Sequence, residues 1–321
     1  MSRPVGPDRG HDAPTVSVVI PSHGRSTSVL RAVDSALNQT RRPDEVIVVL
    51  DGPDRLAQET LDAVDAPGFR VVTLPRNLGA AGARNAGVRA ATSDLIAFLD
   101  DDDEWRPEKL EAQLRDVAET DPSARATTVQ ACGVEWRTGT SVHYWPLRAP
   151  RPGERVADYL FVRRSPGEGM LATPTIMAPR RLLLDVPMPE NGEIHEDFGW
   201  FLDLDERGVR FSVVMEPLVV VHAPPVRESL SRSETWRTSL RWAQGRRGQL
   251  GARAFSAFCL TEVARTARRQ AGPPAFVRIL LSALSGRPSP FELARYLYIW
   301  LLPERARWTM SARPWRRRRR Q

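Results

Sequence analysis

The chain has 321 residues and a mass of 35.9 kDa, which suits one large domain or two modest ones. Hydrophobic residues make up 41% and there are two cysteines, so a wholly disordered chain, a disulfide scaffold and a cysteine metal cluster are excluded. The formal charge of +7 is unevenly placed, because residues 1–240 hold 28 basic and 36 acidic residues whereas residues 241–321 hold 18 and 3.

Apolar, β-branched runs alternate with helical patterns over the first 120 residues. The runs cover 15–20, 45–50, 69–74 and 95–99, and the helical patterns cover about 26–39, 55–64, 80–91 and 107–119. This alternation predicts an α/β fold with a doubly wound, mostly parallel sheet. Ligands bind such sheets at the carboxyl ends of the strands. Polar clusters follow the predicted strands directly, so we expect one shared site there: Pro21-Ser22-His23, Asp51-Gly52, Pro75-Arg76-Asn77 and Asp100–Asp103.

The rest of the chain is less regular. Strand-like runs occur at 126–136 and 211–222, and helical patterns cover about 233–270, 274–285 and 290–302. We therefore predict a disordered N-terminus at 1–13, a sheet domain at 14–230 with halves 14–120 and 121–230, a helical region at 231–310 and a basic disordered tail at 311–321.

The acidic run Asp100–Asp103 follows an apolar strand. One such residue would suffice to cap a following helix, and that is the alternative explanation. Four adjacent carboxylates repel one another, and a cation removes that cost. Oxygen ligands of this kind suit Mg²⁺ or Mn²⁺, which are often held by one or two carboxylates together with phosphate oxygens. The run therefore predicts a metal–diphosphate site.

Five segments occur in a fixed order: VSVVIPSHGR, EVIVVLDG, RNLGAAGARNAG, DLIAFLDDDDEWRPEKLE and HEDFGWFL. In this order and spacing they resemble the family 2 glycosyltransferases of the GT-A fold, over about residues 15–225. The resemblance implies an inverting, metal-assisted transfer of a sugar from a nucleotide-diphospho-sugar to an acceptor hydroxyl. It also implies that residues 14–120 form the nucleotide-sugar-binding half and residues 121–230 the acceptor and catalytic half.

The same resemblance assigns residues to the donor. Pro21 and Ser22 would border the nucleotide, and Arg84 and Asn85 would line its pocket. Asp51 matches the Asp that contacts the donor base, although a leucine precedes it here where the family usually has a second Asp.

The acidic run matches the DXD motif of that family. Asp102 is the expected direct metal ligand, while Asp100 and Asp101 lie toward ribose and diphosphate, and Asp103 is expected to cap the following helix. His222, after the last predicted strand, is expected to approach the metal, with a purely structural histidine as the alternative. Farther on, Arg227 and Arg232 are expected to close over the diphosphate, with a solvated surface as the alternative.

A second acidic pair, Glu196-Asp197, precedes an apolar stretch. Acidic residues are common in the first turn of a helix, which is the alternative explanation. By the resemblance, Asp197 is the general base that deprotonates the acceptor hydroxyl, and Glu196 orients it or contacts the acceptor. His195 is expected to serve local structure.

Apolar helical patterns at 274–302 are followed by an arginine-rich end at 316–320. One interpretation is helices packed on the catalytic domain with a solvated tail. The other is peripheral contact with an anionic membrane, which would place a cytoplasmic enzyme at the inner face of the plasma membrane. No apolar run approaches the length of a spanning helix, the N-terminus lacks the apolar core of a signal peptide, and no motif indicates nucleic-acid binding.

Two other functions fit the sequence less well. A sugar-phosphate nucleotidyltransferase would need a glycine-rich loop after the first strand, where this chain has PSHGR. A catalytically inactive, glycosyltransferase-like binding protein predicts lost acidic sites, and both are intact. The sequence leaves open the donor sugar and whether the acceptor is lipid-linked or a small molecule.

Overall fold

A computed structural model describes residues 13–138, 141–165, 167–190, 192, 194–222 and 235–301. The strands are β1 Val16–Ser22, β2 Glu45–Leu50, β3 Phe69–Thr73, β4 Leu95–Phe98, β5 Glu104–Trp105, β6 Thr128–Thr138, β7 Ser141–Trp145, β8 Met177–Pro179 and β9 Arg210–His222. The α-helices are α1 Ser28–Leu37, α2 Arg55–Leu61, α3 Gly79–Ala90, α4 Lys109–Glu119, α5 Pro122–Arg125, α6 Val156–Phe161, α7 Arg180–Asp185, α8 Glu196–Glu206, α9 Trp236–Gly245, α10 Arg247–Phe258, α11 Ala264–Gln270, α12 Pro273–Leu284 and α13 Pro290–Leu301.

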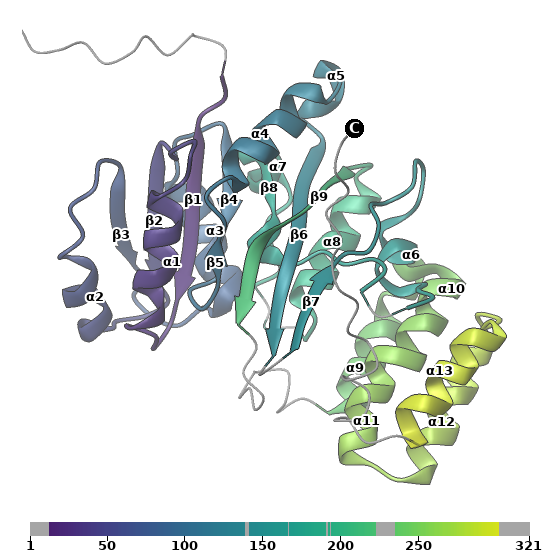
Figure 1. Cartoon of the computed structure of the whole chain (residues 1–321). Coiled ribbons are helices and arrows are strands. Elements are labelled where there is room, and N and C mark those ends of the chain that lie inside the picture. Colours follow the sequence, from purple (N-terminus) through teal and green to yellow (C-terminus); the bar gives the residue numbers. More distant parts are fainter. Residues whose placement is uncertain are drawn as a thin grey trace, which may run out of the picture.

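The described strands form one nine-stranded sheet with the order β3-β2-β1-β4-β8-β6-β9-β5, and β7 pairs with β6 (Figure 1). Strands β1 to β4 pair in parallel, as the alternating pattern predicted. The short strand β8 runs antiparallel to both β4 and β6, and β6 and β9 are parallel to each other. The carboxyl ends of β1, β4, β6 and β9 therefore all lie at the same edge of the sheet.

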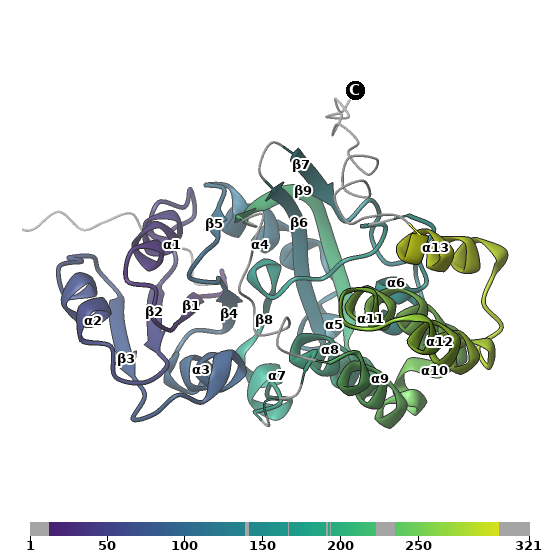
Figure 2. The same cartoon turned by 90° about the horizontal axis from the view of Figure 1, so that it is seen from below.

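Helices cover both faces of the sheet, which explains why its inner strands are continuous apolar runs. Along β1, Val18 and Ile20 belong to the core shared with α1 and α4, whereas Val19 belongs to the core shared with α3 and α8. Figure 2 looks along the sheet and shows these two helical layers, with α1 and α4 above and α3, α7 and α8 below. The sheet is thus buried on both faces and holds its strand ends rigidly.

The chain continues into a helical region at the end of the molecule opposite β3 and α2 (Figures 1 and 2). The sequence predicted one helical stretch over 233–270, but the structure divides it into α9, α10, a π-helical turn at Cys259–Val263 and α11. Helix α10 is itself kinked at Gly251, whose φ of 69° lies in the left-handed region that favours glycine. The helices predicted near 274–285 and 290–302 are confirmed as α12 and α13.

The helical region is continuous with the core on one face of the sheet, because residues of α9, α10 and α11 belong to the same buried cluster as α6 and α8. Within the described ranges, no helix is both long enough and apolar enough to cross a bilayer. The proposed boundaries at 120, 231 and 311 stay predictions, and the N-terminal segment 1–12 and the tail lie outside the described residues.

Candidate active site

The polar clusters predicted from the sequence converge at the carboxyl edge of the sheet, seen from below in Figure 2. Pro21 and Ser22 are buried at the end of β1, where they pair with Val49 and Leu50 of β2. The acidic run follows β4 on the neighbouring strand, and α8 begins beside the same edge. The parallel topology is what brings these segments together from distant parts of the chain.

Arginines neutralise the acidic run after β4. Arg25 Nη1 lies 2.8 Å from Asp101 Oδ1 and 2.9 Å from Asp102 Oδ2. Arg84 Nη2 lies 2.5 Å from Asp100 Oδ1. Burial nevertheless raises the pKa of Asp101, with Arg25 acting in the opposite direction. The repulsion between adjacent carboxylates is therefore relieved here by guanidinium groups, a contribution that sequence reasoning missed for Arg25.

The expected metal ligands are present but differ in their surroundings. The Asp102 side chain is 19% exposed and pairs with Arg25. His222 pairs instead with Glu104, with a distance of 2.7 Å between Nε2 and Oε1. Arg31 connects the two places, because it donates to the Asp102 carbonyl at 3.0 Å and lies 3.0 Å from Glu104 Oε1. Its role, too, was missed from the sequence.

The described residues contain no group of three or more His, Cys, Asp or Glu side chains arranged to hold a metal ion. A site of one or two carboxylates fits Mg²⁺ or Mn²⁺ only when other oxygens, such as those of a diphosphate, complete the coordination. Asp100 and Asp102 could supply these one or two carboxylates, since both side chains are partly exposed at the end of β4 and their oxygens can serve as metal ligands. The metal role of His222 stays a prediction.

Asp51 lies at the end of β2, as expected, and is only 4% exposed. Its Oδ1 accepts a hydrogen bond from the backbone N–H of Leu78 at 2.6 Å and its Oδ2 accepts one from Gly79 at 3.0 Å. It therefore fixes the start of α3, where Gly79 has a φ of 81°. The base-contacting role stays a prediction, and a base would meet a carboxylate whose two oxygens already accept hydrogen bonds.

Arg84 on α3 links the two acidic motifs. Besides its pairing with Asp100, its Nη1 lies 3.8 Å from Glu196 Oε1, and its side chain is only 8% exposed. Asn85, beside it, donates to the Met188 carbonyl and to Glu190, both at 2.8 Å, and accepts from the Met188 N–H. Asn85 thus fixes the loop before α8, while its expected contact with a nucleotide stays a prediction.

The predicted base, Asp197, lies half-buried in the first turn of α8. Its Oδ1 accepts a hydrogen bond from the N–H of Phe198 at 2.8 Å. Burial raises the pKa of Asp197, and burial also raises the pKa of the neighbouring Glu196. A carboxylate with a raised pKa is a stronger proton acceptor once ionised, which is what a general base requires.

His195 precedes α8 with a φ of 62° and connects it to the C-terminal helices. Its Nε2 lies 2.7 Å from Ser239 Oγ, and its ring centroid is 5.1 Å from those of Trp242 and Phe258. Burial lowers the pKa of His195 to about 4, so the ring is neutral near pH 7. The expected structural role stays a prediction, and the sequence held no signal for these distant partners.

The segment after the acidic run departs from the expectation for Asp103. Asp103 does not cap the next helix, because β5 intervenes and α4 starts only at Lys109, where Leu110 N–H donates to the Gln39 side chain instead. Trp105 of β5 is buried next to this segment in the chain. It is 4% exposed and donates to the Pro174 carbonyl at 3.0 Å.

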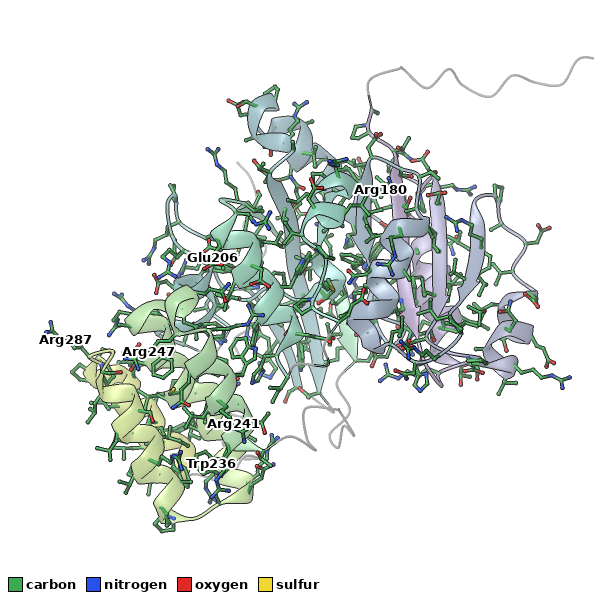
Figure 3. All side chains as sticks on the ribbon, turned by 180° about the vertical axis from the view of Figure 1, so that it is seen from behind. Arg180, Glu206, Trp236, Arg241, Arg247 and Arg287 are labelled. Atoms are coloured by element: carbon green, nitrogen blue, oxygen red, sulfur yellow. The ribbon has the colours of Figure 1, made fainter. Side chains whose placement is uncertain are left out.

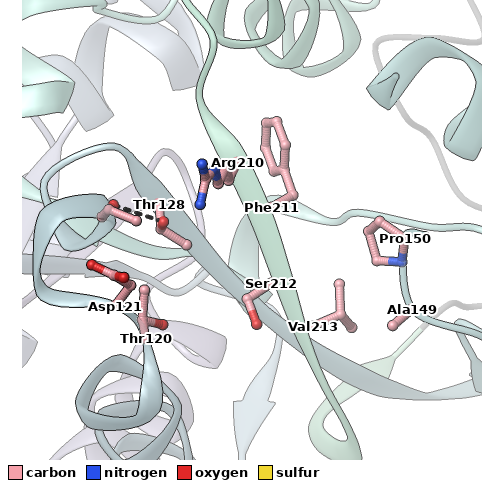
Figure 4. A pocket seen from close by; sticks show the side chains of 10 residues that line it. Thr120, Asp121, Thr128, Ala149, Pro150, Arg210, Phe211, Ser212 and Val213 are labelled. Carbon is pink, nitrogen blue, oxygen red and sulfur yellow. Dashed lines mark hydrogen bonds between the residues drawn. The ribbon is translucent and has the colours of Figure 1, made fainter. Parts of the chain in front are cut away.

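A separate pocket of about 300 Å³ lies at the amino ends of β6 and β9, away from the acidic motifs (Figure 4). Its lining includes Asp121, Thr128 and Arg210. The Thr128 hydroxyl donates to the Ala124 carbonyl and so belongs to the local backbone structure. The pocket is therefore no part of the candidate active site. Arg227 and Arg232, the expected diphosphate contacts, lie outside the described residues.

Comparisons with known proteins agree with this geometry. Residues 17–175 match the model of the family described as Glycosyl transferase family 2. The amylovoran biosynthesis glycosyltransferase AmsB of Erwinia amylovora is 28% identical over 232 residues, which are 70% of this chain and 75% of that relative. The succinoglycan biosynthesis protein ExoO of Rhizobium meliloti is 38% identical over 101 residues, 32% of this chain and 29% of that relative.

Solved structures show the same fold. TarS 1–349 of S. aureus, determined in complex with UDP-GlcNAc, superposes with a TM-score of 0.60 at 16% sequence identity, covering 89% of each chain. At this identity the likeness establishes the fold alone, and it confirms the predicted GT-A architecture with its helical C-terminal region.

Proposed function

Because the chain belongs to glycosyl transferase family 2, we propose that it transfers a sugar from a nucleotide-diphospho-sugar to an acceptor hydroxyl with inversion of configuration. The observation that carries the proposal is the position of Arg84. It lies between Asp100 of the expected donor site and Glu196 of the expected base motif, so the two motifs face one shared space. The names of AmsB and ExoO support a role in polysaccharide biosynthesis.

The donor would bind against the ends of β1, β2 and β4. Pro21 and Ser22 would border the nucleotide, Asp51 and the start of α3 would meet its base, and Asp100 and Asp101 would lie toward ribose and diphosphate. The TarS structures with UDP and with UDP-GlcNAc make uridine-diphosphate sugars the first donors to test.

Asp102, together with His222, would hold Mg²⁺ or Mn²⁺ beside the diphosphate. The ion would neutralise the negative charge that grows on the diphosphate as the glycosidic bond breaks. Arg25 pairs with Asp102 in this structure, so that pairing would loosen when a cation binds.

Asp197 would remove the proton from the acceptor hydroxyl as its oxygen attacks the anomeric carbon. The new glycosidic bond forms on the face opposite the diphosphate, which leaves as the nucleoside diphosphate, and the configuration inverts. The raised pKa of Asp197 favours this proton transfer. Glu196, near Arg84, would orient Asp197 or contact the acceptor.

The acceptor would be a lipid-linked sugar or a small molecule. A lipid-linked acceptor would bring this enzyme to the inner face of the plasma membrane as a peripheral protein, through its C-terminal helices and arginine tail.

Two substitutions test the proposal. Asp197→Asn should retain donor binding and lower transfer by about 10²–10⁴-fold, because it removes the base without changing the shape of the side chain. Asp102→Ala should weaken the metal-dependent binding of the donor. Binding is measured by calorimetry with UDP-GlcNAc and other nucleotide sugars in the presence of Mn²⁺, and transfer by release of the nucleoside diphosphate.

Asp65→Asn is the matched control, because Asp65 is exposed in the loop after α2 and lies outside the candidate site. It should leave binding and turnover unchanged. Full turnover in Asp197→Asn would refute the role of the base. A wild-type protein that binds a donor without ever turning it over would support the binding-protein alternative instead.

A further inference from the structure

The two last helices expose an unusual amount of apolar surface. Among the described residues, twelve large apolar side chains are exposed, and half of them lie on α12 and α13. We call these six the apolar face: Val277 (51% exposed), Leu281 (63%), Leu284 (49%), Phe291 (48%), Leu297 (47%) and Leu301 (75%). Single exposed apolar residues are ordinary, but a group of this kind marks an interaction surface.

The spacing places these residues on the outer sides of their helices. Val277, Leu281 and Leu284 follow one another at helical intervals along α12, while Ile279 and Ala283 on its other side are fully buried. On α13, Leu297 and Leu301 are exposed, whereas Tyr296 and Ile299 are buried. A surface helix normally turns polar residues outward, so helices that are apolar on both sides indicate a covering partner.

The two helices form one surface. The Phe276 ring of α12 stacks on Tyr296 of α13 with a centroid distance of 4.9 Å and meets Trp300 edge-on at 5.4 Å. The Tyr296 hydroxyl also donates to the Phe276 carbonyl at 2.7 Å. In Figure 1 the helical region extends beyond the carboxyl ends of β6 and β9, on the side of the candidate active site.

The surroundings of this surface are strongly basic. Residues 241–301 contain two acidic residues, and both are largely buried against arginines, since Glu262 pairs with Arg163 and Glu292 with Arg253. The same range exposes eight arginines: Arg241, Arg247, Arg253, Arg265, Arg268, Arg269, Arg278 and Arg287. Figure 3 labels Arg241, Arg247 and Arg287 among them. The described part of this region therefore presents positive charge with no exposed carboxylate.

We infer that the apolar face of α12 and α13 docks on an anionic lipid bilayer. The six apolar side chains would enter the boundary between headgroups and acyl chains, and the surrounding arginines would meet anionic headgroups. A second copy of the chain fits less well, because a symmetric contact would bring two sets of arginines together without opposing carboxylates. The inference rests on the membrane contact included in the proposed function and names its surface, but binding to a bilayer requires neither donor nor metal, so vesicle binding and sugar transfer can fail separately.

Vesicle sedimentation with the full chain tests this inference. The protein should bind phosphatidylcholine vesicles that contain phosphatidylglycerol and bind much less to pure phosphatidylcholine. The double substitution Leu281→Ser with Leu297→Ser should weaken binding to the anionic vesicles by about tenfold or more, because two exposed apolar contacts are lost.

Leu56→Ser with Leu184→Ser is the matched control, since these leucines are exposed on α2 and α7, away from the apolar face. This control should leave vesicle binding unchanged. The inference is overturned if anionic vesicles are not bound, if both vesicle types bind equally, or if the two double variants behave alike. Light scattering that shows a dimer abolished only by the apolar-face variant would also overturn it, in favour of a second copy.

Discussion

Charged side chains at the candidate site are arranged so that each acidic group has a different environment. Asp100 and Asp101 each lie within ion-pair distance of an arginine. Among the described residues no arginine or lysine nitrogen comes within ion-pair distance of Asp197, and Arg84 reaches only the neighbouring Glu196, at 3.8 Å. For Asp197 the cost of burial therefore exceeds the attraction of nearby charge, and its pKa is raised.

This imbalance predicts that the ionised base destabilises the fold. A raised pKa in the folded state favours the protonated acid, so this stabilisation is complete below the ordinary aspartate pKa and is lost as the pH rises through the raised value. Above that raised value the half-buried wild-type carboxylate is charged, and Asp197→Asn should therefore raise the melting temperature there while it lowers transfer. Calorimetry over a pH series measures the effect.

The difference between wild type and Asp197→Asn should shrink as the pH falls, because the wild-type acid becomes protonated. Asp65→Asn, in an exposed loop, should show no such trend. An Asp197→Asn protein that melts below wild type at pH 7–8 would mean that the carboxylate is stabilised by contacts that outweigh its burial.

At the scale of elements, α3 takes its N-terminal cap from another strand. Leu78 at its start has no capping side chain, and Asp51 at the end of β2 accepts the hydrogen bonds of two N–H groups there instead. By contrast, α2 is capped locally, because Asp54 accepts a hydrogen bond from the Ala57 N–H at 3.0 Å. The first cap links two elements of the candidate donor site, and the second serves a peripheral helix.

These two caps allow a matched comparison. Asp51→Ala should lower the free energy of unfolding by about 1–3 kcal/mol, because it leaves the Leu78 N–H without its acceptor, whereas the Gly79 N–H keeps its hydrogen bond to Asn77 Oδ1 at 3.0 Å. Asp54→Ala should cost about 1 kcal/mol. Only Asp51→Ala should also weaken donor binding, as measured by calorimetry on folded protein. Equal donor affinity in both variants would separate the start of α3 from the donor site.

The elements also show how far the sequence leads. Strands β1 to β4 were predictable because each is a continuous apolar run followed by turn residues. Strands β5 and β8 have only two and three residues, too few for a periodic pattern, and β5 is the reason that Asp103 does not cap α4. The motif residues Arg84 and Asp197 could be chosen from the sequence, but the partners of Asp51 and His195 could not, since these contacts depend on how distant elements pack.

At the scale of the whole molecule, the C-terminal helices support the helix that carries the candidate base. His195, directly before α8, lies among the aromatic rings of Trp242, Phe258 and Phe198. Arg246 adds an ion pair to Asp203 of α8 at 2.7 Å. The helical region is therefore joined to the catalytic part through the same buried core, and the two parts should unfold together.

Phe258→Ala tests this coupling. Phe258 is fully buried, and its ring centroid lies 5.1 Å from that of His195 and 5.1 Å from that of Phe161. Its removal should cost about 3–5 kcal/mol and shift a single calorimetric transition of the whole chain. Transfer per folded molecule should also fall, because the start of α8 loses its packing.

Phe276→Ala is the matched control for Phe258→Ala. Phe276 packs on Tyr296 and Trp300 of α13 and makes no ring contact with α8 among the described residues. This variant should also lose stability, yet its transfer rate per folded molecule should equal that of wild type when the acceptor is soluble. If both variants keep full transfer, or if Phe258→Ala splits the calorimetric transition into two, the helical region and the base-bearing helix are independent units and the coupling inferred from His195 is wrong.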